Sequence, residues 1–138
     1  MSWKNKDAHG SHGIATSVAT VENDLVGPAS DGLLDLACAA VGSAQIALGF
    51  APLKNYAAGE RVAVVTSGKI AGVTDDLGAA LVVGTYYYLS ESDAGKITAT
   101  KPSTNGDLVQ QVGVACSTTE LLIAIGPAFV YAATGKLT

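Results

Sequence analysis

The sequence predicts an all-β protein: a small β-barrel or sandwich with a weak internal duplication and an extended N-terminal arm. Three observations support this prediction. The apolar runs are short and end in glycine-rich turns at regular spacing, the strongest runs are rich in Val, Thr and Tyr, and one segment pattern occurs twice. The 138 residues suffice for one domain with its own core. We expect residues 1–26 to form the arm and first strand, and residues 27–138 to form the barrel or sandwich.

The repeated pattern is a Gly-apolar-Ala segment, a polar turn, a glutamate and an apolar run. It occurs at residues 49–68 and, in a shorter version, at residues 112–126, with Glu60 and Glu120 in equivalent places. Both copies are predicted to be hairpins, because short apolar runs bounded by turn residues are typical of paired strands. We interpret the two glutamates as the polar ends of equivalent strands, with an ion pair between subunits as the alternative.

The N-terminal residues 1–13 are polar, contain glycine and show no periodicity. Trp3 is unusual in such a segment because an indole on a free tail has nothing to pack against. Two interpretations remain open: a mobile tail, or an arm that docks Trp3 onto a neighbouring subunit. His9 and His12 are three residues apart in the sequence and are candidate metal ligands. A flexible arm would have to be ordered by the metal itself, which weakens binding, so we expect no metal site there.

Residues 14–26 alternate in part and are rich in Thr and Val, which favours a strand. A turn is predicted at residues 27–32. Residues 33–41 are ambiguous between strand and helix. Their alanine and leucine content slightly favours one short helix, which Ser30 or Asp31 would cap.

The rest of the chain reads as strands joined by Gly-rich turns. Tyr86, Tyr87 and Tyr88 lie in the strongest strand signal of the sequence, and alternation allows at most two of them to line one surface. Packing in the core or between subunits is the first interpretation of these rings, and contact with a glycan is the second. The expected strands are 44–52, 61–66, 70–73, 85–90, 97–100, 108–116 and 121–125.

The composition restricts the class of partner. Hydrophobic residues make up 49% and charged residues only 14%, against about 25% in ordinary soluble domains. No apolar run approaches the ~20 residues that a membrane-spanning helix needs, so we do not expect the protein to bind or cross a membrane. We expect instead that other subunits cover its nearly neutral surface. The net charge of −4 and scattered basic residues argue against nucleic acid. No signal peptide is recognisable, which predicts that the protein stays in the cytoplasm where it is made.

No reaction chemistry is recognisable, and we expect neither enzymatic activity nor a cofactor. The acidic pairs Asp75–Asp76 and Glu91–Asp93 fall in predicted turns, where local hydrogen bonding favours such residues. Cys38 and Cys116 lie in apolar segments and are expected as buried free thiols, with a disulfide as the alternative. Arg61 is the only arginine and is expected to pair with a carboxylate of its own or a neighbouring subunit.

A series of short motifs resembles a β-module that is common in tailed-phage virion proteins. The motifs are Ala57-Ala58-Gly59-Glu60-Arg61-Val62, Thr66-Ser67-Gly68, Gly84-Thr85-Tyr86-Tyr87-Tyr88-Leu89-Ser90, Gly95-Lys96-Ile97-Thr98 and Val112-Gly113-Val114-Ala115. This module occurs in capsid decoration and head-fibre proteins and at the ends of tail fibres, and the likeness covers roughly residues 35–126.

The resemblance implies a homotrimeric decoration or cement protein on the outer capsid surface of a virion, made in the host cytoplasm and bound to the major capsid protein. The alternative is a tail-fibre or tail-tip module that contacts a host glycan. The expected residues of the subunit or capsid interface are Trp3, Arg61, Tyr86 and Tyr88.

Overall fold

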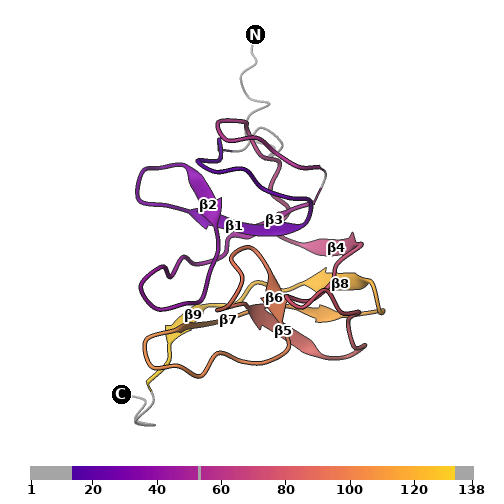
Figure 1. Ribbon diagram of the computed structural model, residues 1–138. Coiled ribbons are helices and arrows are strands. Elements are labelled where there is room, and N and C mark those ends of the chain that lie inside the picture. Colours follow the sequence, from indigo (N-terminus) through magenta and orange to yellow (C-terminus); the bar gives the residue numbers. More distant parts are fainter. Residues whose placement is uncertain (1–13, 53, 133–138) are drawn as a thin grey trace.

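The computed structural model describes residues 14–52 and 54–132. The described chain is all-β, which confirms the predicted fold class (Figure 1). Its strands are β1 (Asp24–Pro28), β2 (Leu34–Leu36), β3 (Gly49–Ala51), β4 (Gly68–Ala71), β5 (Tyr86–Leu89), β6 (Ile97–Thr98), β7 (Leu108–Ala115), β8 (Glu120–Ile123) and β9 (Ala128–Val130).

The strands form two antiparallel sheets that lie one above the other in Figure 1. The smaller sheet has the order β2-β1-β3, with β1 paired on both edges. The larger sheet has the order β4-β8-β7-β5-β6, and β9 pairs with the first half of β7. Its centre is the eight-residue strand β7, which pairs with β5, β8 and β9.

The main core lies between the two sheets. Alternation sends Leu25 and Phe50, which are register partners in the smaller sheet, toward the larger sheet, and sends Tyr87 and Leu89 of β5 to meet them. Burial of this apolar surface is the main favourable contribution to folding. The buried residues of the main core are Leu25, Ala37, Ala39, Ala47, Phe50, Ile70, Val73, Leu81, Tyr87, Leu89, Ile97, Val112, Ala115, Leu121 and Ile123.

A second apolar cluster covers the other face of the smaller sheet. Val26, Leu34 and Ala51 point away from the larger sheet and pack with Tyr56 and Val62 of the following loop region. Both faces of the smaller sheet are therefore buried. This explains why β1 reads as a nearly continuous apolar run rather than as an alternating one.

The expected short helix at residues 33–41 is wrong. Leu34–Leu36 is strand β2, and Cys38 forms a further antiparallel bridge to Gln45. Tertiary pairing outweighs the helix propensity of Ala and Leu here, because Ala37, Cys38 and Ala39 are all buried and pack as extended chain.

The predicted turn at residues 27–32 begins too early. Gly27 and Pro28 still belong to β1, and Gly27 is buried with the Ile46 carbonyl against it. A Cβ at position 27 would lie 1.8 Å from that oxygen. Glycine is therefore needed at position 27 for close backbone approach rather than for a turn.

The two copies of the repeated pattern differ in how many residue pairs their strands form. In the second copy β7 and β8 form a hairpin with three register pairs, Gly113 to Ile123, Val114 to Leu122 and Ala115 to Leu121. In the first copy, Phe50 and Val65 exchange both backbone hydrogen bonds, but this pair is an isolated bridge and residues 61–66 form no continuous strand. The shared feature is antiparallel pairing of the Gly-apolar-Ala segment with the run after the glutamate.

Candidate functional site

The face of the larger sheet that points away from the core carries a row of exposed side chains. The strand registers place Tyr86 opposite Val114, Val114 opposite Leu122, and Leu122 opposite Lys69, so the row crosses β5, β7, β8 and β4. Tyr86 is 53% exposed and Leu122 is 45% exposed.

A bulge and the β7–β9 pairing extend this surface. Between Tyr87 and Tyr88 the register with β7 shifts, so that Tyr88 lies opposite Gln111. Beyond it Val109 pairs with Phe129, which is 62% exposed. We call the surface formed by these residues the outer face: Lys69, Tyr86, Tyr88, Val109, Gln111, Val114, Leu122 and Phe129.

The three tyrosines divide as alternation predicts. Tyr87 is 1% exposed and packs in the core, where its hydroxyl accepts a 2.9 Å hydrogen bond from the Val82 amide. Tyr86 and Tyr88 lie on the outer face. The prediction that at most two of the three rings line one surface is confirmed.

Charge is sparse on the outer face and lies at its margins. Lys69 has an ion-pair distance of 3.7 Å from Glu120, both side chains being more than a third exposed. The ammonium of Lys101 lies 5.6 Å from the centroid of the Tyr88 ring, a cation–π arrangement. The centre of the outer face is therefore apolar and aromatic, with lysines at its margins.

A shallow hollow of about 350 Å³ lies at one end of the outer face. Tyr88 and Phe129 contribute aromatic rings to it, Gln111 an amide and Lys101 an ammonium. Such a mixture of apolar walls and a few polar groups is typical of small-ligand sites.

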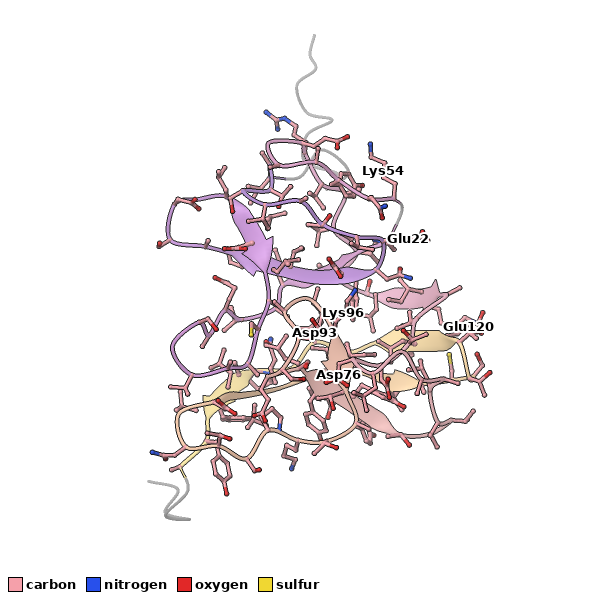
Figure 2. All side chains as sticks on the ribbon, in the orientation of Figure 1. Glu22, Lys54, Asp76, Asp93, Lys96 and Glu120 are labelled. Carbon is pink, nitrogen blue, oxygen red and sulfur yellow. The ribbon has the colours of Figure 1, made fainter. Side chains whose placement is uncertain are left out.

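A second polar region ties the two sheets together. Asp24, 4% exposed at its side chain, lies at the start of β1 and accepts a 2.8 Å hydrogen bond from Lys96. Lys96, labelled in Figure 2, lies in the turn before β6. Backbone hydrogen bonds flank this pair: Gly95 accepts from the Leu25 amide at 2.8 Å and donates to the Ala37 carbonyl at 2.7 Å. The pair and the Gly95 bonds hold the smaller sheet on the larger one.

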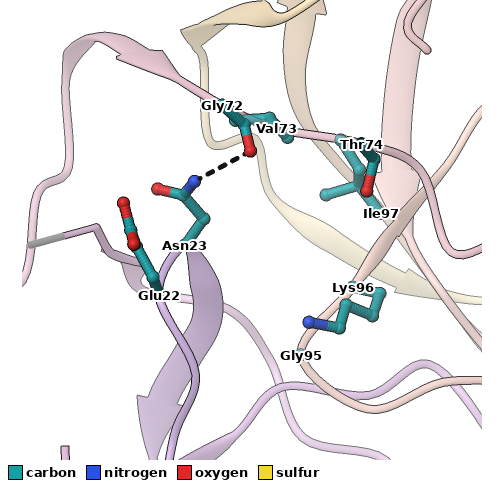
Figure 3. A pocket seen from close by; sticks show the side chains of 8 residues that line it. All are labelled: Glu22, Asn23, Gly72, Val73, Thr74, Gly95, Lys96 and Ile97. Carbon is teal, nitrogen blue, oxygen red and sulfur yellow. Dashed lines mark hydrogen bonds between the residues drawn. The ribbon is translucent and has the colours of Figure 1, made fainter. Parts of the chain in front are cut away.

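The hollow beside this tie is small. It has a volume of about 60 Å³, and Asn23, in the left-handed conformation with φ 72°, bridges it by donating to the carbonyls of Ala71 at 3.1 Å and Gly72 at 3.3 Å (Figure 3). That volume holds on the order of two waters. The arrangement is therefore a structural joint between strands rather than a substrate site.

The interface residues expected from the sequence lie in different places. Tyr86 and Tyr88 come together on the outer face. Arg61 is exposed, and its backbone forms an isolated antiparallel β-bridge with Ala15. It therefore lies beside the smaller sheet and not with the two tyrosines on the larger one. Trp3 lies outside the described residues. Sequence reasoning missed Leu122 and Phe129, although the alternation of Leu121, Leu122 and Ile123 would have indicated that Leu122 points outward.

The two glutamates of the repeat each pair with a lysine of the same chain. Glu60 pairs with Lys54 and also accepts the Ala57 amide at 2.9 Å, and these hydrogen bonds lower the pKa of Glu60. Glu120 pairs with Lys69. Because all four side chains are at least 38% exposed, these pairs contribute little to stability.

The first of the two acidic pairs considered for catalysis, Asp75–Asp76, has a structural role. Asp75 accepts the amides of Leu77 at 2.9 Å and Ala79 at 2.8 Å, which closes the loop before residue 80. Asp76 accepts the hydroxyls of Ser90 at 2.8 Å and Ser92 at 3.2 Å. Both carboxylates are thus committed to local hydrogen bonds.

Both cysteines are free thiols, but only one is buried. Cys38 is 8% exposed, whereas Cys116 is exposed at the turn between β7 and β8. The expectation that Cys116 is buried is wrong, because the strand ends at Ala115 and the thiol belongs to the polar turn.

Within residues 14–52 and 54–132, no three side chains of His, Cys, Asp or Glu come together as a metal site. His9 and His12 lie outside this range. Over the same residues, no helix is long and apolar enough to cross a membrane.

Comparison of the chain with models of known protein families found no match, and a search of curated proteins found none either.

Proposed function

We propose that the protein is a structural component of a tailed-phage virion that decorates the outside of the capsid and cements neighbouring major capsid protein subunits. The observation that carries this proposal is the outer face. A contiguous, nearly uncharged surface with exposed Tyr86, Leu122 and Phe129 is of the kind that marks a protein-binding site. The resemblance of the strand and turn motifs to phage virion β-modules supplies the identity of the partner.

The mechanism is adhesion without chemistry. Tyr86 and Leu122 act as anchors that lose contact with water when the outer face meets the shell, and Lys69 with Glu120 remains at the rim. A protein that binds the assembled lattice better than free subunits stabilises the lattice by mass action. A homotrimer, with the N-terminal arm reaching a neighbour, is part of the proposal. The proposed protein is not an enzyme.

The test is co-sedimentation with purified heads of the virus that encodes the chain. Truncation of an interface anchor costs about 2 kcal/mol, so Leu122→Ser and Tyr86→Ser should each weaken binding about thirtyfold. The control is Leu77→Ser, because Leu77 is 87% exposed and is not one of the residues of the outer face. Saturated heads should also rupture at a higher temperature. Equal binding by Leu122→Ser and Leu77→Ser, or an unchanged rupture temperature, would contradict the proposal.

The hollow between Tyr88 and Phe129 favours a second candidate, a tail-fibre or tail-tip module that binds a host glycan. Aromatic faces stack on sugar rings, and Gln111 and Lys101 could orient hydroxyl or acidic groups there. If the protein is such a module, wild type should bind host cells and Phe129→Ser should not, while the two should not differ in binding to heads. If wild type does not bind host cells and Phe129→Ser weakens binding to heads, the glycan candidate is excluded.

A further inference from the structure

β9 is an edge strand with a free side. It pairs with β7 on one side, and on its other side no strand of residues 14–52 and 54–132 pairs with it. Phe129 is 62% exposed and Val130 is 66% exposed. No charged side chain lies within residues 127–132 to repel an incoming strand. An unpaired edge of this kind is a template on which another chain can add a strand.

The hydrogen bonds beside β9 show which way its backbone groups point. The Tyr131 amide donates to the Asp107 carbonyl at 2.8 Å, so residue 131 faces β7. The Leu108 amide donates to the Ala39 carbonyl at 2.8 Å instead of to β9, so Leu108 and its register partner Val130 do not bond to each other. Val130 therefore carries its N–H and C=O groups on the free side of β9.

The same alternation determines the direction of the other two residues of β9. Ala128 lies two residues before Val130 and also points its N–H and C=O groups to the free side, whereas Phe129 between them bonds to β7. The free edge therefore offers one donor and one acceptor on each side of Phe129. A second copy of the same strand, running antiparallel, presents the same groups at the same spacing and is complementary to it.

The edge strands β2, β3, β4 and β6 are each covered or protected by described residues. In the smaller sheet, residues 15–17 bond to the outer side of β2, and Val65 bonds to the outer side of β3. In the larger sheet, the amide of Asp76 bonds to β6. β4 carries the charged Lys69, and the side chain of Asn23 binds the carbonyls at its end. β9 lacks any such protection.

We propose that β9 is the docking edge for a second copy of this chain, in which two β9 strands pair antiparallel about a two-fold axis at Phe129. Ala128 of each copy exchanges both backbone hydrogen bonds with Val130 of the other. The two Phe129 side chains lie next to each other as a non-hydrogen-bonded pair, the arrangement in which side chains come closest. The contact is isologous, because the same surface serves both partners.

The pairing makes one surface of two outer faces. Phe129 belongs to the outer face, so the two larger sheets continue into each other through β9. A strand of 3 residues is short for a lasting dimer, since stable interfaces bury about 1,000 Å² or more. We therefore expect brief pairing in dilute solution and lasting pairing where copies are held close together. Because a two-fold contact cannot close a trimer, on a capsid it would link neighbouring trimers, and that consequence rests on the proposed function.

Single cysteines test the pairing with the protein alone, so the result does not depend on capsid binding. Phe129→Cys and Val130→Cys are matched, because the two native side chains are adjacent on β9 and similarly exposed. Both are made with Cys116→Ser, which removes the exposed thiol, while Cys38 is buried. In the proposed pairing, residue 129 meets its own counterpart at about 4.5 Å between Cα atoms, within disulfide range. Residue 130 is offset from its counterpart by about 7 Å along the strand and lies too far away.

With oxidised glutathione and equal protein concentrations, Phe129→Cys should form disulfide-linked dimers about tenfold faster than Val130→Cys on non-reducing gels. In urea the two rates should be equal. In the Phe129→Cys dimer, the amides of Ala128 and Val130 should exchange with solvent about tenfold more slowly than in the reduced protein. Equal rates in the folded state, faster cross-linking of Val130→Cys, a difference that persists in urea, or unchanged exchange of these amides would each overturn the proposal.

Discussion

Replacement of Lys96 by Met tests whether the contact between the two sheets depends on the Asp24–Lys96 pair. Met keeps most of the length and apolar stem of the lysine but removes the ammonium that donates to Asp24 at 2.8 Å. Asp24, at 4% exposure, would then keep, among the residues that the structure describes, the hydrogen bond from the Val21 amide at 2.9 Å. An uncompensated carboxylate would remain between the sheets.

The size of the effect follows from the burial of the two partners. Removal of one partner from a fully buried ion pair costs about 3–5 kcal/mol. Lys96 is 36% exposed at its side chain, so water already screens part of the interaction, and we expect about 2–3 kcal/mol. At about 3–4 °C per kcal/mol for a domain of this size, Tm should fall by about 6–12 °C.

Urea unfolding and calorimetry measure this change, and a double-mutant cycle with Asp24→Asn isolates the pair. The coupling energy should account for most of the single-mutant loss, because the neutral amide that Asp24→Asn introduces no longer needs the ammonium. Lys54→Met is the matched control: Lys54 pairs with Glu60 at the surface, so this variant should unfold as wild type does. Equal Tm values for Lys96→Met and Lys54→Met would refute the reasoning.

Three further changes test other parts of the structure. Gly27→Ala should destabilise the fold by about 1–3 kcal/mol in urea unfolding, because the new Cβ meets the Ile46 carbonyl. Gly78→Ala is the control and should cost less, because Gly78 has open space around it and the only cost is the strain of alanine at a positive φ. Tyr87→Phe should cost about 1 kcal/mol, since only the hydrogen bond from the Val82 amide is lost and the ring still fills the core. In the native protein a thiol reagent should label Cys116 rapidly and Cys38 only on unfolding, and Cys116→Ser should remove the fast phase.

Local pattern predicted most strands of the larger sheet well, but it predicted the smaller sheet and the connections poorly, since the expected strand 61–66 is absent and the expected strand 44–52 shrinks to Gly49–Ala51. The run Thr85 to Ser90 and the hairpin of β7 and β8 follow from β-propensity, alternation and turn residues, all of which act over a few neighbours. Residues 33–41 were expected as helix because their preference is local, whereas their extended form depends on bridges to Gln45 and Thr16 and on burial between layers. Gly27 shows the same limit, since the carbonyl that requires glycine comes from a later segment.

The site could be predicted only in part for the same reason. Alternation placed Tyr86 and Tyr88 on one surface, but only the strand order reveals that Val114 and Leu122 continue the row. Asp24 and Lys96 are 72 residues apart, and no pattern along the chain links them. Arg61 is expected at the interface because it is the only arginine. Its position, however, is set by backbone pairing with Ala15, a residue of the N-terminal part of the chain, and the sequence pattern around Arg61 does not reveal this pairing.

A reconstruction of heads incubated with the protein tests most directly whether this molecule works by adhesion through its larger sheet. We expect density for the protein on the outside of the shell, with the side chains of Tyr86 and Leu122 against capsid subunits and the smaller sheet turned outward. Heads that remain bare, or a protein whose outer face points to solvent while another surface touches the shell, would contradict this function.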